Sequence, residues 1–200
     1  MKLHRQGLQA SADAYDVVVV GAGGAGMAAA LFAALEGASV LLVERTSQVG
    51  GTTAWSAATT WVPGSHHAAE VNPEDSLALA SLYLDHAVGE RAPKAMREAF
   101  LRHGAAAVRL IESRSEVQFR PYAKHPDYLS DLPGSTLCGR ALEPLPFDGR
   151  KLGPLLALVR PPIPEFTVLG GMMIDRYDIP HLLGMTRSWG SFVHSIKLIA

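Results

Sequence analysis

An uninterrupted run of uncharged residues, positions 17–35, changes character along its length. Residues 17–20 are four valines, residues 21–26 contain four glycines, and residues 27–35 are strong helix formers. This order predicts a strand over 16–20, a turn, and a helix over 27–35. A second apolar run, residues 39–43, predicts a neighbouring strand that is buried on both faces. The run exceeds the roughly 18 residues from which a membrane-spanning helix is proposed, but its glycines and valines favour the strand, turn and helix.

The middle of the chain shows helical periodicity. Residues 72–75 (NPED) have the composition of a helix start, and Gly89 is placed to end that helix. A second helix is predicted after Pro93, with Met96, Ala99 and Phe100 facing inward and Gly104 as an interruption. Residues 117–119 predict a short strand. Prolines are dense from position 121 to position 164, which predicts an ordered connecting arm without regular structure.

Three glycines in the predicted turn form a candidate binding motif. Gly21, Gly23 and Gly26 form GxGxxG, in which the glycines permit a tight turn, a close approach to a diphosphate and close packing of helix on strand. Glu44 ends the second predicted strand, eighteen positions after Gly26, near the spacing of an acid that binds a ribose hydroxyl. The pattern predicts a dinucleotide site and disfavours NADP, whose 2′-phosphate an acid would repel. The alternative for Glu44 is an ordinary surface acid.

The segment after Val43, ERTSQVGGTTAWSAATTWVPGS, resembles the second cofactor segment of a flavoprotein family. That family includes the flavoprotein subunits of fumarate reductase and succinate dehydrogenase and the 3-ketosteroid dehydrogenases. The resemblance implies FAD, although Ala57, Ala58 and Thr59 stand where the family has glycines. A Ser/Thr-rich surface loop is the alternative. The predicted cofactor-binding residues are Gly21, Ala22, Gly23, Gly24, Ala25, Gly26, Glu44, Arg45, Gly50, Gly51, Thr52, Thr53, Ser56 and Ala57.

A later segment, HPDYLSDLPGSTLCGRALEPLPFDGRKLG, resembles the ketosteroid dehydrogenase branch of that family. The likeness is most specific over residues 139–153. In this branch an active-site tyrosine is expected at the second aromatic of a DYY pattern, and here that position is Leu129. Tyr128 is therefore the only catalytic candidate, with a half-buried structural tyrosine as the alternative.

Charge and cysteine content exclude several classes. The chain has 18 basic and 19 acidic residues and a formal net charge of −1, so it lacks the positive field that nucleic acid requires. Its single cysteine, Cys138, allows no internal disulfide, and residues 1–16 lack the apolar core of a secretory signal, so a cytoplasmic location is expected. His66 and His67 have no further ligand at a suitable spacing, so no metal site is predicted.

These observations together predict an α/β fold, a Rossmann-like FAD-binding domain with an incomplete parallel sheet. Residues 1–14 are expected to be an arm, and residues 15–200 the N-terminal part of the domain, without its capping domain and final FAD segment. The family resemblance implies an oxidoreductase acting on a carbon–carbon bond beside a carbonyl, with an unidentified electron acceptor and a small-molecule substrate for which a steroid-like ketone is one option. A fumarate-reductase-like activity on a small enoate, an NAD-dependent dehydrogenase and a non-catalytic nucleotide-binding fragment stay open.

Overall fold

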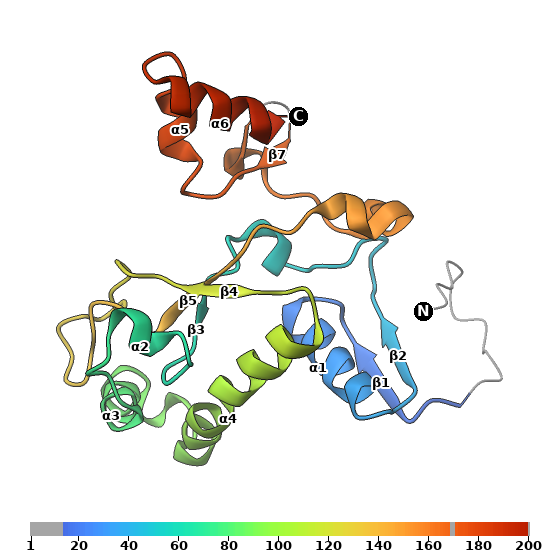
Figure 1. Ribbon diagram of the computed structural model, residues 1–200. Coiled ribbons are helices and arrows are strands. Elements are labelled where there is room, and N and C mark those ends of the chain that lie inside the picture. The colour runs from blue at the N-terminus through green and yellow to red at the C-terminus, as the bar shows by residue number, and fades with distance from the viewer. Residues whose placement is uncertain (1–13, 169–170, 200) are drawn as a thin grey trace. The chain divides into compact units, whose positions relative to one another are not determined.

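The computed structural model describes residues 14–168 and 171–199, which form two compact units (Figure 1). The terminal unit combines both ends of the chain, Met1–Ser56 and Arg150–Ala200, and the central unit is Ala57–Gly149. The chain therefore leaves the terminal unit once and returns to it, and each unit has its own sheet and helices.

The terminal unit opens with a strand, a helix and a second strand. β1 is Val17–Val20, α1 is Gly24–Leu35 and β2 is Val40–Val43. The two strands are parallel, with Val17 opposite Val40 and Val20 opposite Val43. The predicted strands are confirmed to within one residue. The helix begins three residues earlier than predicted, because the glycine turn itself forms its first turn.

One face of β1 lies under α1 and the other does not. Val19 lies close to Gly26 of the helix, whereas the side chains of Val18 and Val20 are 57% and 83% exposed. The β2 residues are all half-buried. The prediction that residues 39–43 form a strand buried on both faces is therefore wrong, and among the described residues only one face of the strand pair has a helix packed on it.

The remaining elements of the terminal unit are short. They are η1 (Thr53–Trp55), η3 (Gly149–Leu158), which starts at the last residue of the central unit, η4 (Pro164–Phe166), β6 (Thr167–Val168), β7 (Met172–Met173), α5 (Ile179–Leu183) and α6 (Trp189–Ile199). β6 and β7 form an antiparallel pair. Helices α5 and α6 pack against each other, with the rings of His181 and His194 stacked at 4.1 Å between centroids.

The central unit is built on a three-stranded antiparallel sheet in the order β3-β5-β4. The strands are β3 (Thr60–Trp61), β4 (Phe119–Pro121) and β5 (Ala141–Pro144), and the helices are α2 (Ala68–Val71), α3 (Leu77–Ala87), η2 (Gly89–Arg91) and α4 (Lys94–Arg114). β5 is the middle strand, so the prediction of an arm without regular structure over 121–164 is wrong. β5 forms because it pairs with β3 and β4, two strands that are distant from it in the sequence.

Two helix predictions in this unit also need correction. α3 begins at Leu77, because Ser76 caps it by accepting the Leu79 N–H at 3.2 Å, whereas the Asn72 amide donates to the Thr136 hydroxyl instead. α4 continues through Gly104, where an added Cβ would lie 3.3 Å from Val62. Gly104 thus allows α4 to pack closely on the loop after β3, and it does not interrupt the helix.

The core of the central unit is small and lies between α4 and the sheet. Val62, Val108 and Leu142 form a buried cluster, and Phe119 packs against it. Met96 and Phe100, predicted to face inward, are 65% and 42% exposed. The buried residues of α4 are Leu101 and Val108, and its first turn contains none.

A buried arginine links the rest of the central unit. The side chain of Arg140 is 1% exposed; its guanidinium donates to both Asp75 oxygens at 2.6 and 2.9 Å and to Asp127 at 2.7 Å. The rings of Trp61 and Tyr83 lie 5.9 and 5.8 Å from the guanidinium carbon. Burial alone would lower the pKa of Arg140, but the two carboxylates outweigh it and raise the pKa above its usual value.

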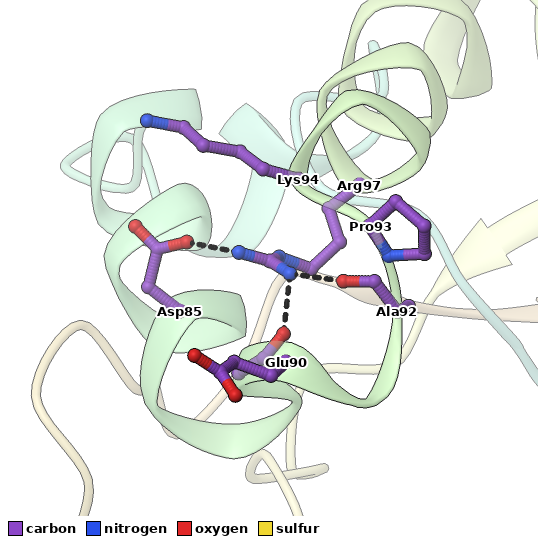
Figure 2. Close-up of a pocket in the computed structure, with 7 residues that line it drawn as sticks. Asp85, Glu90, Ala92, Pro93, Lys94 and Arg97 are labelled. Atoms are coloured by element: carbon purple, nitrogen blue, oxygen red, sulfur yellow. Dashed lines mark hydrogen bonds and ion pairs between the residues drawn. The ribbon is translucent and has the colours of Figure 1, made fainter.

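A second arginine fixes the corner between α3 and α4 (Figure 2). Arg97 donates to Asp85 on α3 at 2.8 Å and to the carbonyls of Gly89 and Ala92 in the connecting turn. The hollow at this corner has a volume of about 400 Å³, and its lining includes Lys94 as well. Arg97 is bonded through two of its nitrogens to α3 and to the connecting turn, so we assign the corner a structural role.

Replacing Arg140 with methionine tests the role of the buried arginine. Arg140→Met leaves two buried carboxylates without their cation, and the expected loss is about 3–5 kcal/mol of unfolding free energy in a urea titration followed by tryptophan fluorescence. Arg109→Met, at an exposed position of α4, should change the unfolding free energy by less than about 0.5 kcal/mol. Equal effects of the two substitutions would contradict the role given to Arg140.

Candidate functional site

The glycine turn presents the start of α1 as an anion-binding position. Gly23 precedes the helix in an extended conformation, and the intrahelical hydrogen bonds start with the Met27 N–H, which donates to the Gly23 carbonyl at 2.9 Å. The N–H groups of Gly24, Ala25 and Gly26 therefore have no acceptor within the helix. Three such groups at the positive end of a helix favour a phosphate.

The second predicted cofactor segment contacts this turn backbone to backbone. The Gly50 N–H donates to the Ala22 carbonyl at 2.7 Å, and a Cβ added to Gly51 would lie 3.0 Å from the Gly23 Cα. Thr53 also reaches the helix start, where its hydroxyl accepts the Gly24 N–H at 3.3 Å. Two segments that the sequence predicted separately thus form one site, which we call the glycine cradle: residues 21–26, residues 50–53 and Glu44.

Glu44 lies at the end of β2, beside the turn. One carboxylate oxygen accepts the Ala22 N–H at 2.9 Å, and the other accepts the Thr46 N–H at 2.9 Å and the Thr46 hydroxyl at 3.1 Å. These hydrogen bonds, that from Ala22 most strongly, lower the pKa of Glu44 to about 2. The carboxylate is thus ionised at neutral pH, and it has lone pairs left for further donors such as ribose hydroxyls.

The other predicted cofactor residues lie at the edge of the cradle or outside it. The Arg45 side chain is exposed. The Thr52 carbonyl accepts the Trp55 N–H at 3.1 Å, and the Ser56 hydroxyl donates to the Thr53 carbonyl at 2.9 Å, so both shape η1. Ala57 is exposed and is the first residue of the central unit. A role for these four residues in binding the cofactor stays a prediction.

Arg160 belongs to this site and was missed by the sequence. Its backbone N–H donates to the Val49 carbonyl at 2.9 Å, which brings it beside the second segment. The guanidinium donates to the Thr46 hydroxyl at 3.3 Å and lies 5.0 Å from the centre of the Trp55 ring. Its Nε is buried without a hydrogen-bond partner among the described residues. No local motif identifies Arg160, because the pairing with Val49 spans more than a hundred positions.

The cradle fits a dinucleotide in three respects. A Cβ at Gly26 would come within 1.8 Å of the Gly21 carbonyl oxygen, so the turn is closed as tightly as a glycine allows. The helix N–H groups suit a diphosphate, and Glu44 lies next to them as an acceptor for a sugar hydroxyl. The buried Arg160 Nε–H is a further unused donor on the Thr46 side of the site.

The catalytic candidate Tyr128 lies in the central unit and is 93% exposed, so a half-buried structural role does not describe it. Its ring makes an edge contact with His125 at 5.9 Å between centroids. The neighbouring Leu129 is held in place through its N–H, which donates to the Tyr83 hydroxyl at 3.3 Å. A cavity of about 170 Å³ next to these residues is lined by Thr59, Trp61, Tyr83, Leu84, His125, Pro126, Asp127, Tyr128 and Ala141.

The structure brings carboxylates, which are candidate metal ligands, to His66 and His67, although the sequence showed none at a short spacing. Glu112 of α4 lies 3.0 Å from His66 Nε2 and 2.9 Å from His67 Nε2. Glu70 lies 2.9 Å from His67 Nδ1. Glu112 is 45 positions from His67, so a search for ligands at short spacing could not find it.

Within the described residues, no helix combines the length and the apolar character that crossing a membrane requires. The uncharged run that raised this possibility is divided between β1, the glycine turn and α1.

Comparison with protein families gives a match over residues 16–181 to the FAD binding domain. The chain belongs to this family. FAD is therefore its cofactor, as the second glycine segment predicted, and the predicted α/β class with a parallel sheet is confirmed.

Similar proteins include dehydrogenases of cyclic ketones. A 4-oxocyclohex-2-ene-1-carboxylate 5-dehydrogenase of Sinomonas cyclohexanicum is 38% identical over 92% of this chain and 31% of its own length. A 3-oxosteroid 1-dehydrogenase of Mycolicibacterium smegmatis is 33% identical over 92% of this chain and 32% of its own length. The chain thus spans about a third of these relatives, and the resemblance to the ketosteroid dehydrogenase branch is confirmed.

A solved structure supports the same relationship. The 3-ketosteroid delta1-dehydrogenase of Sterolibacterium denitrificans, determined in complex with 1,4-androstadiene-3,17-dione, matches with a TM-score of 0.79 and 31% sequence identity. The match covers 92% of this chain and 32% of that protein.

Gly26→Ala tests the closure of the cradle. The added methyl would collide with the Gly21 carbonyl, so the turn has to open, and we expect FAD binding to be lost and the unfolding midpoint to fall. Both are measured on the purified chain, by flavin fluorescence quenching and by thermal denaturation. Gly190→Ala in α6, where the nearest atom would be 3.7 Å away, is the matched control and should leave both unchanged. Tight FAD binding by Gly26→Ala would refute the assignment.

Proposed function

We propose that the chain is the N-terminal part of an FAD-dependent dehydrogenase that introduces a carbon–carbon double bond beside the carbonyl of a cyclic ketone. The single observation that carries this proposal is the glycine cradle, in which both glycine segments and Glu44 meet at the start of α1. The names of the relatives supply the substrate class.

Each group of the cradle has a role in binding. The N–H groups of Ala25 and Gly26 hold the diphosphate, and ionised Glu44 accepts the ribose hydroxyls. The Gly24 N–H donates to the Thr53 hydroxyl, which places that hydroxyl at the same helix start. Arg160 closes the side of the site next to Thr46 and supplies its Nε–H to a cofactor oxygen.

FAD held by these residues would supply the acceptor for the hydride that leaves the substrate. The chain's own contribution is to hold the cofactor rigidly and, with residues of the whole enzyme, to position the substrate. A protein base has to remove the proton next to the carbonyl, and a hydroxyl such as that of Tyr128 can serve as a proton carrier or as a donor to the carbonyl oxygen.

The names of two relatives indicate the same type of reaction on substrates of different size. One dehydrogenates position 5 of a 4-oxocyclohexene carboxylate, the other position 1 of a 3-oxosteroid, and in both a ring bond beside the keto group is oxidised. The cavity of about 170 Å³ in the central unit is below the roughly 300–1,000 Å³ usual for a complete ligand site. We therefore propose a six-membered cyclic ketone as the common substrate element, with a fused steroid as one member of the class.

Other activities differ from this proposal in measurable ways. A fumarate-reductase-like enzyme would reduce a small enoate and need arginines for its carboxylates. A non-catalytic fragment would bind FAD without turnover.

We also propose that the uncovered face of β1, with Val18 and Val20, is covered by a further part of the protein, in keeping with relatives about three times as long.

Glu44→Gln tests the binding role of the ionised carboxylate. Because hydrogen bonds to charged groups contribute about 1.5–3 kcal/mol, the variant should bind FAD about ten- to a hundredfold more weakly in a fluorescence titration. With its pKa near 2, wild-type Glu44 stays ionised from pH 7 down to pH 5, so the ratio of the two affinities should be the same at both pH values. Glu36→Gln, exposed after α1, is the control and should bind normally.

A pair of substitutions tests the catalytic proposal at residues 128 and 129. In the whole enzyme, with an artificial electron acceptor and either 4-oxocyclohexanecarboxylate or a 3-oxosteroid, Tyr128→Phe should lower kcat about tenfold or more without changing FAD binding. Leu129→Tyr should raise the activity on the steroid relative to the smaller ketone. Unchanged kcat in Tyr128→Phe would remove Tyr128 from the mechanism, and absence of turnover on both ketones would refute the function while leaving FAD binding intact.

A further inference from the structure

Outside the glycine cradle, the central unit contains a compact group of metal-binding side chains. His66 and His67 lie just before α2, and Glu112 lies near the end of α4. The candidate ligand atoms of these three residues all lie within 4.8 Å of one another. The Glu112 side chain is 10% exposed and that of His67 is 15% exposed, so two of the three ligands are held inside the unit.

His67 lies between two carboxylates, one at each ring nitrogen. Its Nδ1 lies 2.9 Å from Glu70, and a carboxylate only accepts, so Nδ1 donates to Glu70. Its Nε2 lies 2.9 Å from Glu112 Oε1, and a proton on Nε2 or a metal ion bound to it would satisfy this pair. An imidazole whose other nitrogen donates to a carboxylate is the usual arrangement of a metal-binding histidine.

The second oxygen of Glu112 provides an independent observation. Oε2 is buried and lies 3.0 Å from His66 Nε2, but the pair lacks hydrogen-bond geometry, and this oxygen accepts no hydrogen bond from the described residues. Oε1, in contrast, accepts the Phe119 N–H at 3.0 Å, which fixes the carboxylate in place. A buried carboxylate oxygen without a donor, next to an imidazole nitrogen, is accounted for by a cation bound between them.

We propose that His66, His67 and Glu112 bind one zinc ion, with water as its fourth ligand. Two imidazoles and a carboxylate are ligands that Zn²⁺ accepts, whereas Mg²⁺ and Ca²⁺ require oxygen ligands. The ligand atoms need to separate only to about 3.3 Å for tetrahedral bonds of about 2.0–2.1 Å. The His66 side chain is 35% exposed and provides the route of entry. The ion joins the loop before α2 to α4.

The test uses the chain without an affinity tag, treated with a chelator and then dialysed. Calorimetric titration with ZnCl₂ should give one site per chain, and MgCl₂ should give no binding. Co²⁺ at the same site should produce the visible absorption of a tetrahedral complex. His66→Gln and Glu112→Gln should each weaken Zn²⁺ binding by about tenfold or more. His103→Ala, an exposed histidine on α4, is the control and should bind like wild type.

Several results would overturn the proposal. These are the absence of a one-to-one Zn²⁺ site in the wild-type chain, wild-type affinity in Glu112→Gln, or an equal loss in His103→Ala. His66→Gln changes an exposed side chain, so it keeps the test valid if Glu112→Gln does not fold, as judged by far-ultraviolet circular dichroism. The site shares no residue with the glycine cradle, so FAD binding and zinc binding can fail separately.

Discussion

The terminal unit depends on the distance between Gly26 and the Gly21 carbonyl, at which no side chain can be placed. This close approach lets α1 start shortly after β1, so that the N–H groups of its first turn lie at the end of the strand. It also lets β2 run parallel to β1, since the Gly21 N–H donates to the Val43 carbonyl at 2.7 Å. Glu44 follows Val43 directly, and so the contact that closes the turn also places the acid beside it.

The central unit depends on the pairing of one buried arginine with two carboxylates. Its apolar core consists of a few residues, and Arg140 joins β5 to the segment before α3 and to the segment containing Tyr128. A buried arginine with two carboxylates does not add much net stability over an apolar core, but it specifies which segments meet, because any other pairing would leave a buried charge. The exposed Tyr128 follows directly after Asp127, which is bonded to Arg140.

The predictable parts of the structure were those determined by neighbouring residues. The strand, turn and helix at residues 17–35 and the acid at Glu44 follow from local patterns, and the cradle they form was predicted almost completely. β5, Arg160 and Glu112 were not predicted, because each obtains its role from a partner many positions away: β5 from two strands, Arg160 from Thr46 and Val49, and Glu112 from two histidines. The proline-rich composition around β5 even argued against a strand.

One residue without the freedom of glycine has a left-handed backbone. Ala58 has φ +53°, in the region where an L-residue is strained by roughly 1–2 kcal/mol and glycine is not. Such strain persists only where the surrounding structure holds the backbone in place. Ala58 is the second residue of the central unit, so the strained conformation lies where the chain leaves the terminal unit. The direction in which the chain enters the central unit is therefore set by the surrounding structure and not by the preference of the residue itself.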